Sequence, residues 1–383
     1  MSEHGRDAGE LPASASALAL WLRFLRLPGI GARRRLELLN YFGSLDGLFS
    51  AARGQVERLL ADAPAALKGL RSEPDGKQLE TDLAWFSEPS HHLMTWQDED
   101  YPRLLREIPD PPVALFVMGE RRLLALPQLA MVGSRNASAA GRENASSFAR
   151  ELARAGLVIT SGMALGIDGA AHRGALEAGA ATIAVMGTGL DRVYPARHRE
   201  LAHAIAQQGA LVSEFPLGTP PRPENFPIRN RIVSGLSLGV LIVEAAERSG
   251  ALITARLASE QGREVFAIPG SIHSPLARGC HRLIRQGAKL VETARDILEE
   301  LGPLASLVLP EATRRNAPPI AADDALPEPA QILLACLGHD PVTIDALIER
   351  CGLTADTVSS MLLVLELHGL VASGPGGSYQ RLT

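Results

Sequence analysis

The chain has 383 residues, of which 46% are hydrophobic, and a formal net charge of −5. This length predicts two or three domains, and the composition excludes a disordered chain. No apolar run approaches the ~20 residues that cross a bilayer, and residues 1–10 lack the apolar segment of a secretory signal. The three cysteines are far apart and form no metal-ligand spacing, so we expect a cytoplasmic protein without metal or cofactor.

The first region, residues 1–90, is expected to form a helical domain. Residues 18–86 are rich in Leu and Ala, are interrupted by Gly and Pro, and show no alternating strand pattern. The segment 27–31, followed by arginines at 33–35, resembles a helix-hairpin-helix. Two interpretations stay open. The backbone amides of the hairpin contact a phosphate without reading sequence, or the hairpin is a structural turn beside an exposed basic face.

The central region, residues 91–305, alternates short apolar segments with amphipathic ones. This pattern predicts βαβ units and a Rossmann-like, doubly wound parallel sheet covered by helices on both faces. The predicted strands are 113–118, 129–132, 157–160, 182–186, 210–212, 240–243 and 265–268. The predicted helices include 139–154, 169–177, 198–207 and 252–260.

The last part of the chain is predicted to be a linker, residues 306–327, and a small domain, residues 328–383. The small domain has the pattern of three helices and a Gly-rich hairpin at 373–379, which is typical of a winged helix-turn-helix. Its predicted recognition helix, 354–368, contains no Lys or Arg, although helices that read DNA are basic. We therefore expect this domain to bind protein, or to pack on its own chain, more than it binds DNA.

Several central strands end in turns of small residues. The strand at 129–132 runs into Gly133-Ser134-Arg135, and the strand at 157–160 runs into Ser161-Gly162, with Gly166 just before the next helix. In a parallel sheet such turns share the carboxyl edge, where glycine lets a ligand approach and helix N-termini attract anions. The sequence therefore predicts a phosphate-binding floor at this edge.

Known catalytic and nucleotide-binding motifs are missing from the sequence. The stretch Gly187–Arg192 begins like GxGxxG but ends in Arg192, where Gly or Ala is required. Neither GxxxxGK[ST] nor GxSxG occurs. Asp168 and His172 lie four apart at a predicted helix start, and we interpret them as a cap and a packing residue because no third catalytic partner is visible.

The segment Glu224–Arg231 brings together an aromatic ring, a turn-forming proline and two guanidinium groups. Rings stack on nucleobases, and guanidinium groups grip phosphates. Residues 220–290 hold ten basic and five acidic residues, a local positive excess that is typical of nucleic-acid binding. Ser249–Thr254 is expected to cap a helix over the same edge. Two questions stay open: whether Phe226 stacks on a base or packs its loop, and whether one arginine pairs with Glu244 instead of phosphate.

Taken together, these motifs closely resemble the DNA-processing protein A family (DprA, also called Smf) over about residues 93–301. In chain order they are Tyr101-Pro102, Gly133-Ser134-Arg135, Ser161–Asp168, Ala171-His172, Tyr194-Pro195, Phe226–Arg231, Ser249–Thr254 and Pro269-Gly270. The resemblance implies a SAM-like N-terminal domain and a Rossmann-like core that binds single-stranded DNA and dimerises. It also implies a protein that is not an enzyme, protects incoming DNA and loads the RecA recombinase onto it in natural transformation.

The predicted site and partners follow from the turns and from this resemblance. The predicted DNA-binding residues are Gly133, Ser134, Arg135, Ser161, Gly162, Gly166, Arg222, Phe226, Arg229, Asn230, Arg231, Ser249, Gly250 and Thr254. The expected partners are single-stranded DNA, duplex DNA more weakly, RecA, and a second copy of the chain through the Rossmann-like domain, with no membrane. Two alternatives stay open. One is a nucleotide-binding enzyme of the phosphoribohydrolase type, whose usual PGGxGTxxE stretch is broken here after Pro269-Gly270 by Ser271. The other is a scaffold whose basic patch contacts an acidic protein.

Overall fold

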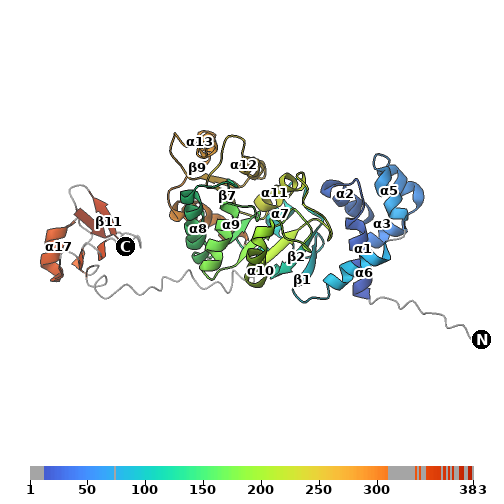
Figure 1. Ribbon diagram of the computed structural model, residues 1–383. Coiled ribbons are helices and arrows are strands. Elements are labelled where there is room, and N and C mark those ends of the chain that lie inside the picture. Colours follow the sequence, from blue (N-terminus) through green and yellow to red (C-terminus); the bar gives the residue numbers. More distant parts are fainter. Residues whose placement is uncertain are drawn as a thin grey trace, which may run out of the picture. The chain divides into compact units, whose positions relative to one another are not determined.

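The computed structural model describes residues 13–72 and 75–308 and, further on, parts of 333–381 (Figure 1). The chain separates into two compact units that divide between Glu311 and Ala312, within the predicted linker. Helix α14 (Ala294–Val308) continues into that predicted linker, and residues 309–332 lie outside the described residues. None of the described helices is long and apolar enough to cross a membrane.

The N-terminal region is helical, as predicted, and its hairpin is built by glycine. The helices are α1 (Ala13–Leu25), α2 (Ala32–Phe42), α3 (Leu45–Ser50), α4 (Arg53–Leu59), α5 (Pro64–Arg71) and α6 (Gly76–Trp85). Gly29, in the turn between α1 and α2, has φ of +75°, a conformation that glycine adopts without strain. Arg35 donates to the carbonyl oxygens of Leu25 and Leu27, so it ties α2 to the end of α1. The expected basic face is therefore smaller than the sequence indicates.

The central sheet has nine strands, among them all seven predicted ones. They are β1 (His91–Thr95), β2 (Ala114–Gly119), β3 (Gln128–Val132), β4 (Val158–Ser161), β5 (Thr182–Val185), β6 (Ala210–Ser213), β7 (Gly239–Ile242), β8 (Glu264–Ala267) and β9 (Lys289–Leu290). Their spatial order is β1-β2-β6-β5-β4-β3-β7-β8-β9. The two additional strands, β1 and β9, lie at the edges of the sheet, where burial is less complete.

The predicted parallel sheet is present, with an antiparallel strand near one edge. The seven strands from β3 to β9 pair in parallel, whereas β2 runs antiparallel to both β1 and β6. A buried apolar strand looks the same in either direction, so the sequence of β2 does not reveal its orientation. In the parallel part of the sheet, β3 has β4 on one side and β7 on the other, and the chain adds strands outward from β3 in both directions. This arrangement is the topological switch point at which α/β sheets bind ligands.

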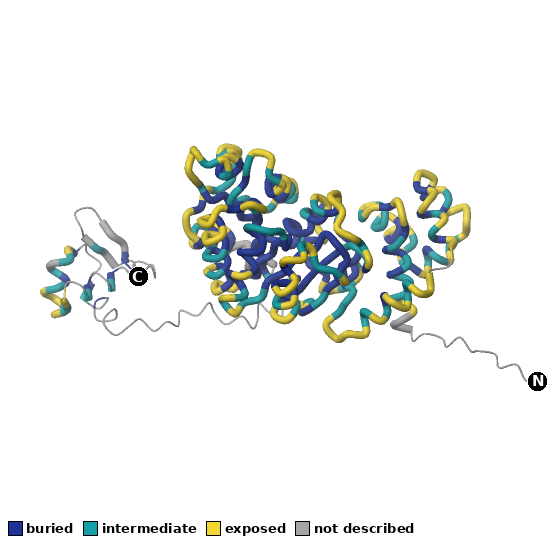
Figure 2. Tube along the Cα trace, viewed as in Figure 1, coloured by how far each residue is buried: buried dark blue, intermediate teal, exposed yellow. Residues whose placement is uncertain are grey.

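Helices cover both faces of the sheet, and the side chains of β3 show the two layers. Leu129 and Met131 pack with α8 (Ala139–Arg154) and α9 (Ile167–Glu177). Ala130 and Val132 point to the other face, where α11 (Asn225–Gly235) and α12 (Ala251–Glu260) pack. The strands form the buried centre in Figure 2. The remaining helices of this unit are α7 (Arg103–Arg106), α10 (Arg199–Gln208) and α13 (Arg278–Arg285), with short 3₁₀ turns η1 (Arg121–Ala125) and η2 (Ala196–His198).

The segment predicted to turn at Pro227 forms a helix instead, α11 (Asn225–Gly235). Pro227 is the third residue of this helix. A proline is tolerated there because the first N–H groups of a helix have no intrahelical partner. The helical period then sends neighbouring residues of the motif in different directions, which decides the roles of its two arginines.

The C-terminal unit contains a small sheet with the order β10-β12-β11. Its described elements are β10 (Val342–Thr343), α17 (Ile344–Cys351), β11 (Val371–Gly374) and β12 (Ser378–Arg381). The predicted hairpin is the antiparallel pair β11–β12. Much of the predicted recognition helix lies outside the described residues.

Candidate nucleic-acid interface

A cavity of about 560 Å³ opens at the carboxyl ends of β3 and β7, at the switch point. Nine predicted site residues line it: Gly133, Ser134, Arg135, Phe226, Arg229, Asn230, Ser249, Gly250 and Thr254. The prediction that strand-end turns and the Phe226 segment form one site therefore agrees with the geometry. Asn136 and Arg248 also line the cavity and were not among the predicted site residues. Both follow the ends of predicted strands.

The turn after β3 is held from two sides. The amide of Ser134 donates to the carbonyl oxygen of Glu244 at 2.7 Å, and the carbonyl oxygen of Ser134 accepts from the amide of Ile167 at 3.2 Å. A Cβ at Gly133 would lie 2.6 Å from Cγ1 of Ile167, so only glycine fits between the strand and α9. The clamped turn leaves Arg135 exposed beside the cavity.

Phe226 offers an aromatic surface to the cavity. Its side chain is partly exposed, and its ring lies over the backbone of Gly187, where an added Cβ would be 2.9 Å from the ring. The guanidinium carbon of Arg135 lies 5.7 Å from the ring centroid, within cation–π range. The ring and the cation therefore face the same opening, which favours stacking on a base over a purely packing role for Phe226.

Arg229 lines the floor of the cavity, but its guanidinium is engaged within the protein. Arg229 is 4% exposed and donates to the carbonyl oxygens of Gly162, at 2.6 Å, and Val185. Burial lowers the pKa of Arg229 to about 10, and the carboxylate of Asp168 opposes this shift. The prediction that Arg229 is a free phosphate-binding group is therefore wrong. Its guanidinium group links the ends of β4 and β5 under the cavity through these two hydrogen bonds.

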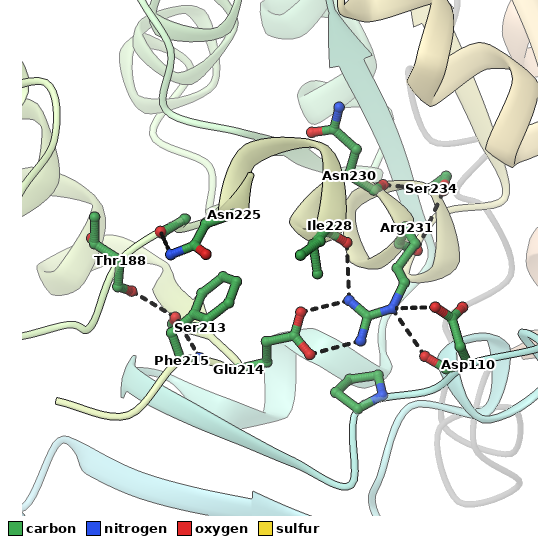
Figure 3. A network of polar contacts seen from close by, with 12 residues as sticks. Asp110, Thr188, Ser213, Glu214, Phe215, Asn225, Ile228, Asn230, Arg231 and Ser234 are labelled. Carbon is green, nitrogen blue, oxygen red and sulfur yellow. Dashed lines mark hydrogen bonds and ion pairs between the residues drawn. The ribbon is translucent and has the colours of Figure 1, made fainter. Parts of the chain in front are cut away.

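Arg231 extends from α11 toward Glu214 and Asp110 (Figure 3). It forms a two-point ion pair with Glu214, at 2.6 and 2.7 Å, and a third contact with the carboxylate of Asp110 at 2.9 Å. Burial works against its charge, but Glu214, Asp110 and Tyr101 together outweigh this effect, and the pKa of Arg231 is raised. Arg231 does not line the cavity, so its assignment to the DNA site is corrected. The amide of Asn230 points away from this network and lines the cavity.

Glu244 has a different partner from the one expected. Its carboxylate accepts from the amide of Ser138 at 2.9 Å and from the hydroxyl of Ser138 at 2.5 Å. It therefore holds the N-terminus of α8 and positions neither Arg229 nor Arg231. Neither arginine of α11 pairs with Glu244. Arg231 pairs with Glu214 instead.

Four further predicted site residues do not line the cavity. The hydroxyl of Ser161 donates to the carbonyl oxygen of Met131 at 2.6 Å, so it ties β4 to β3. Gly162 packs under Arg229. Gly166 has φ of +78° and leaves no room for a side chain, because a Cβ there would lie 2.2 Å from the carbonyl oxygen of Ser134. Arg222 is exposed but lies outside the cavity lining. These glycines shape the site without forming its surface.

Asp168 and His172 have structural roles: His172 packs as predicted, but Asp168 is not the predicted helix cap, because Gly166 occupies the N-cap position of α9. The carboxylate of Asp168 accepts from the amides of Gly162 and Ala164 at 3.1 and 3.2 Å, so it orders the loop before α9 and not the first turn of the helix. Burial raises its pKa. His172 is fully buried, its Nδ1 lies 2.8 Å from the hydroxyl of Thr182, and burial lowers its pKa to about 3.

The N-terminus of α12 forms the remaining wall. The hydroxyl of Ser249 accepts from the amide of Ala251 at 3.3 Å, but the N-cap position of α12 is Gly250, which has no side chain to cap the helix. Gly250 and Thr254 complete this wall, and Arg248 precedes it as an exposed cation with no ion pair among the described residues. The fold and the site thus define a Rossmann-like α/β protein with a ring and exposed arginines around a cavity at its switch point.

The comparisons with known proteins name the family. The model of the DNA recombination-mediator protein A family matches residues 92–302, and that of the DprA winged helix domain matches residues 316–377. The chain belongs to this family, DprA/Smf, and its C-terminal unit is a winged-helix domain. Protein Smf of Escherichia coli (strain K12) is 44% identical over 365 residues, which cover 95% of each chain.

Two solved structures resemble the chain in both fold and sequence. DNA processing protein A from Streptococcus pneumoniae gives a TM-score of 0.67 at 39% identity, covering 74% of this chain and 97% of that one. The protein from Helicobacter pylori, whose structure is described for its single-stranded DNA binding mode, gives a TM-score of 0.51 at 31% identity. That match covers 55% of this chain and 96% of the other.

Proposed function

We propose that this protein binds single-stranded DNA in the cavity at the carboxyl ends of β3 and β7. The observation that carries the proposal is the partly exposed ring of Phe226, which lines the cavity with the guanidinium of Arg135 5.7 Å from its centroid. A base can stack on the ring while the cation meets the phosphate beside it. The Helicobacter pylori relative, described as binding single-stranded DNA, supports this assignment.

The chemistry of the lining favours binding without strong sequence preference. Stacking accepts any base, because every base has an aromatic face. The exposed cations Arg135 and Arg248 supply phosphate contacts, and the small turns at Gly133 and Gly250 let the strand approach the backbone. A binder of this kind fits a protein that coats strands of arbitrary sequence.

We infer that the protein protects incoming DNA and loads RecA onto it in natural transformation, as a cytoplasmic homodimer that acts through its Rossmann-like domain. We further infer that it is not an enzyme. Asp168 is the only carboxylate among the described residues that line the cavity, and it is buried and hydrogen-bonded to two amides. It is therefore poorly placed as the general base that a phosphoribohydrolase needs.

A salt titration of DNA binding tests the proposal. We expect an oligothymidylate to bind more tightly than duplex DNA, and mononucleotides to bind least. Phe226→Ala should weaken the single-strand complex about 5- to 150-fold, the cost of a lost stack. Arg135→Ala should likewise weaken the single-strand complex. It should in addition reduce the magnitude of the slope of log binding constant against log salt concentration by about 0.7.

The matched control for Arg135→Ala is Arg295→Ala, which removes an exposed arginine of α14 that does not line the cavity. This variant should leave affinity and salt slope unchanged. Wild-type affinity in both Phe226→Ala and Arg135→Ala would refute the site. Turnover of a nucleotide would instead support the enzyme alternative.

A truncation after Leu326 tests the role of the winged-helix domain. Its basic residues from 328 onward are only Arg350 and Arg381, so it brings little positive charge to a phosphate backbone. We expect the truncated chain to keep single-strand affinity within a few-fold of the full chain, measured by fluorescence anisotropy. A loss of more than about 30-fold would assign this domain a direct share of DNA binding.

A further inference from the structure

Tyr194 is an exposed aromatic residue next to the proposed DNA site. It lies in the loop between β5 and η2, and its side chain is 47% exposed. Its ring centroid lies 5.5 Å from that of Phe226, with the planes tilted by 42°. Tyr194 is not among the residues that line the cavity, so it extends the aromatic surface beyond the rim.

Three groups thus follow one another across this surface: the guanidinium of Arg135, the ring of Phe226 and the ring of Tyr194. A single exposed aromatic residue is ordinary on a protein surface. A partly exposed ring that contacts another partly exposed ring at a cavity rim is less so, because together they leave a continuous apolar strip open to water. Successive bases of a single strand, each with two aromatic faces, match such a strip.

We propose that Tyr194 forms a second base-stacking subsite, which holds the nucleobase adjacent to the one at Phe226. This inference rests on the proposed function, since it assigns the next nucleotide of the same strand. It also sets a direction: the strand leaves the cavity over Phe226 toward the β5–η2 loop.

The main alternative is that Tyr194 only supports the ring of Phe226 from the side. A tryptophan probe distinguishes contact from support, because a base stacked on an indole quenches its emission. We expect Tyr194→Trp to show a decrease in tryptophan fluorescence when the full-length protein is titrated with oligothymidylate. The matched control is Tyr41→Trp in the helical region. Tyr41 is 60% exposed and also lies against another ring, with its centroid 4.9 Å from that of Phe42.

The same subsite predicts an affinity pattern. Tyr194→Ala and Tyr194→Leu should both weaken oligothymidylate binding about 5- to 150-fold, whereas Tyr194→Phe should bind like the wild type. Leucine keeps an apolar contact for Phe226 but offers no stacking face. Wild-type affinity of Tyr194→Leu, or no quenching of Tyr194→Trp beyond that of Tyr41→Trp, would overturn the subsite.

The outcomes also separate this inference from the proposed function. If wild-type protein does not bind oligothymidylate, the proposed function itself fails. If it binds and Phe226→Ala weakens binding while the Tyr194 variants do not, only the second subsite is wrong.

Discussion

Replacing Arg231 with methionine is expected to lower the free energy of unfolding by about 3–5 kcal/mol, the usual effect of removing one partner of a buried ion pair. Glu214 would keep a nearly buried carboxylate without its cation, and the carbonyl oxygen of Asp110 would lose its donor. Methionine fills similar space, so packing loss contributes little. Urea unfolding of the full chain, followed by circular dichroism, measures the effect.

Two comparisons make this test specific. Arg256→Met removes an exposed arginine with an i,i+4 partner, Glu260, and should cost less than about 0.5 kcal/mol. The double variant Arg231→Met/Glu214→Gln should recover part of the loss, because the unpaired charge is gone. Where Arg231→Met remains folded, its single-strand affinity should stay within a few-fold of the wild type. A large affinity loss at unchanged stability would return Arg231 to the DNA site.

Arg229→Met is expected to destabilise the protein by a similar amount, about 3–5 kcal/mol, for a different reason. The carbonyl oxygens of Gly162 and Val185 would lose a shared donor, and the carboxylate of Asp168 would lose the nearby positive charge. Because Arg229 forms the cavity floor, single-strand affinity should fall as well. Thermal unfolding and anisotropy titration of the same preparation measure both effects.

The neighbouring carboxylate supplies the control for this variant. In Arg229→Met/Asp168→Asn the buried negative charge is also removed. The double variant should therefore lose less stability than the two single variants lose in sum. Arg229→Lys keeps the charge but lacks the planar fork, and should lie between the wild type and Arg229→Met. Strict additivity, or a loss below about 1 kcal/mol for Arg229→Met, would contradict the structural role.

The sequence was sufficient to predict most of the central fold. Apolar runs identified seven strands, and the amphipathic period gave α8 its observed bounds, Ala139–Arg154. The orientation of β2 was not predictable, because strands buried on both faces carry no mark of direction. The two-residue strand β9 is too short to produce a pattern.

The site was predicted in position but not in every role. Strand ends at one edge of a parallel sheet must lie close together, and this rule predicted the position of the Gly133 turn, whereas Phe226 was assigned to the site by its chemistry and the family resemblance. The arginines of α11 were misassigned because a sequence shows a charge without showing its partner. Glu214 lies 17 residues from Arg231, and Gly162 lies 67 residues from Arg229. Treating Pro227 as a turn residue also hid the helical period that separates the two arginines.

The contact between Gly162 and Arg229 has a consequence for the evolution of the family. A Cβ at position 162 would lie 2.5 Å from Nη1 of Arg229, so the two positions share one volume. A larger residue at position 162 therefore requires Arg229 to move or to become smaller, although 67 residues separate the two positions along the chain. We therefore expect the two positions to covary: relatives with a larger residue at the first should carry a shorter one at the second.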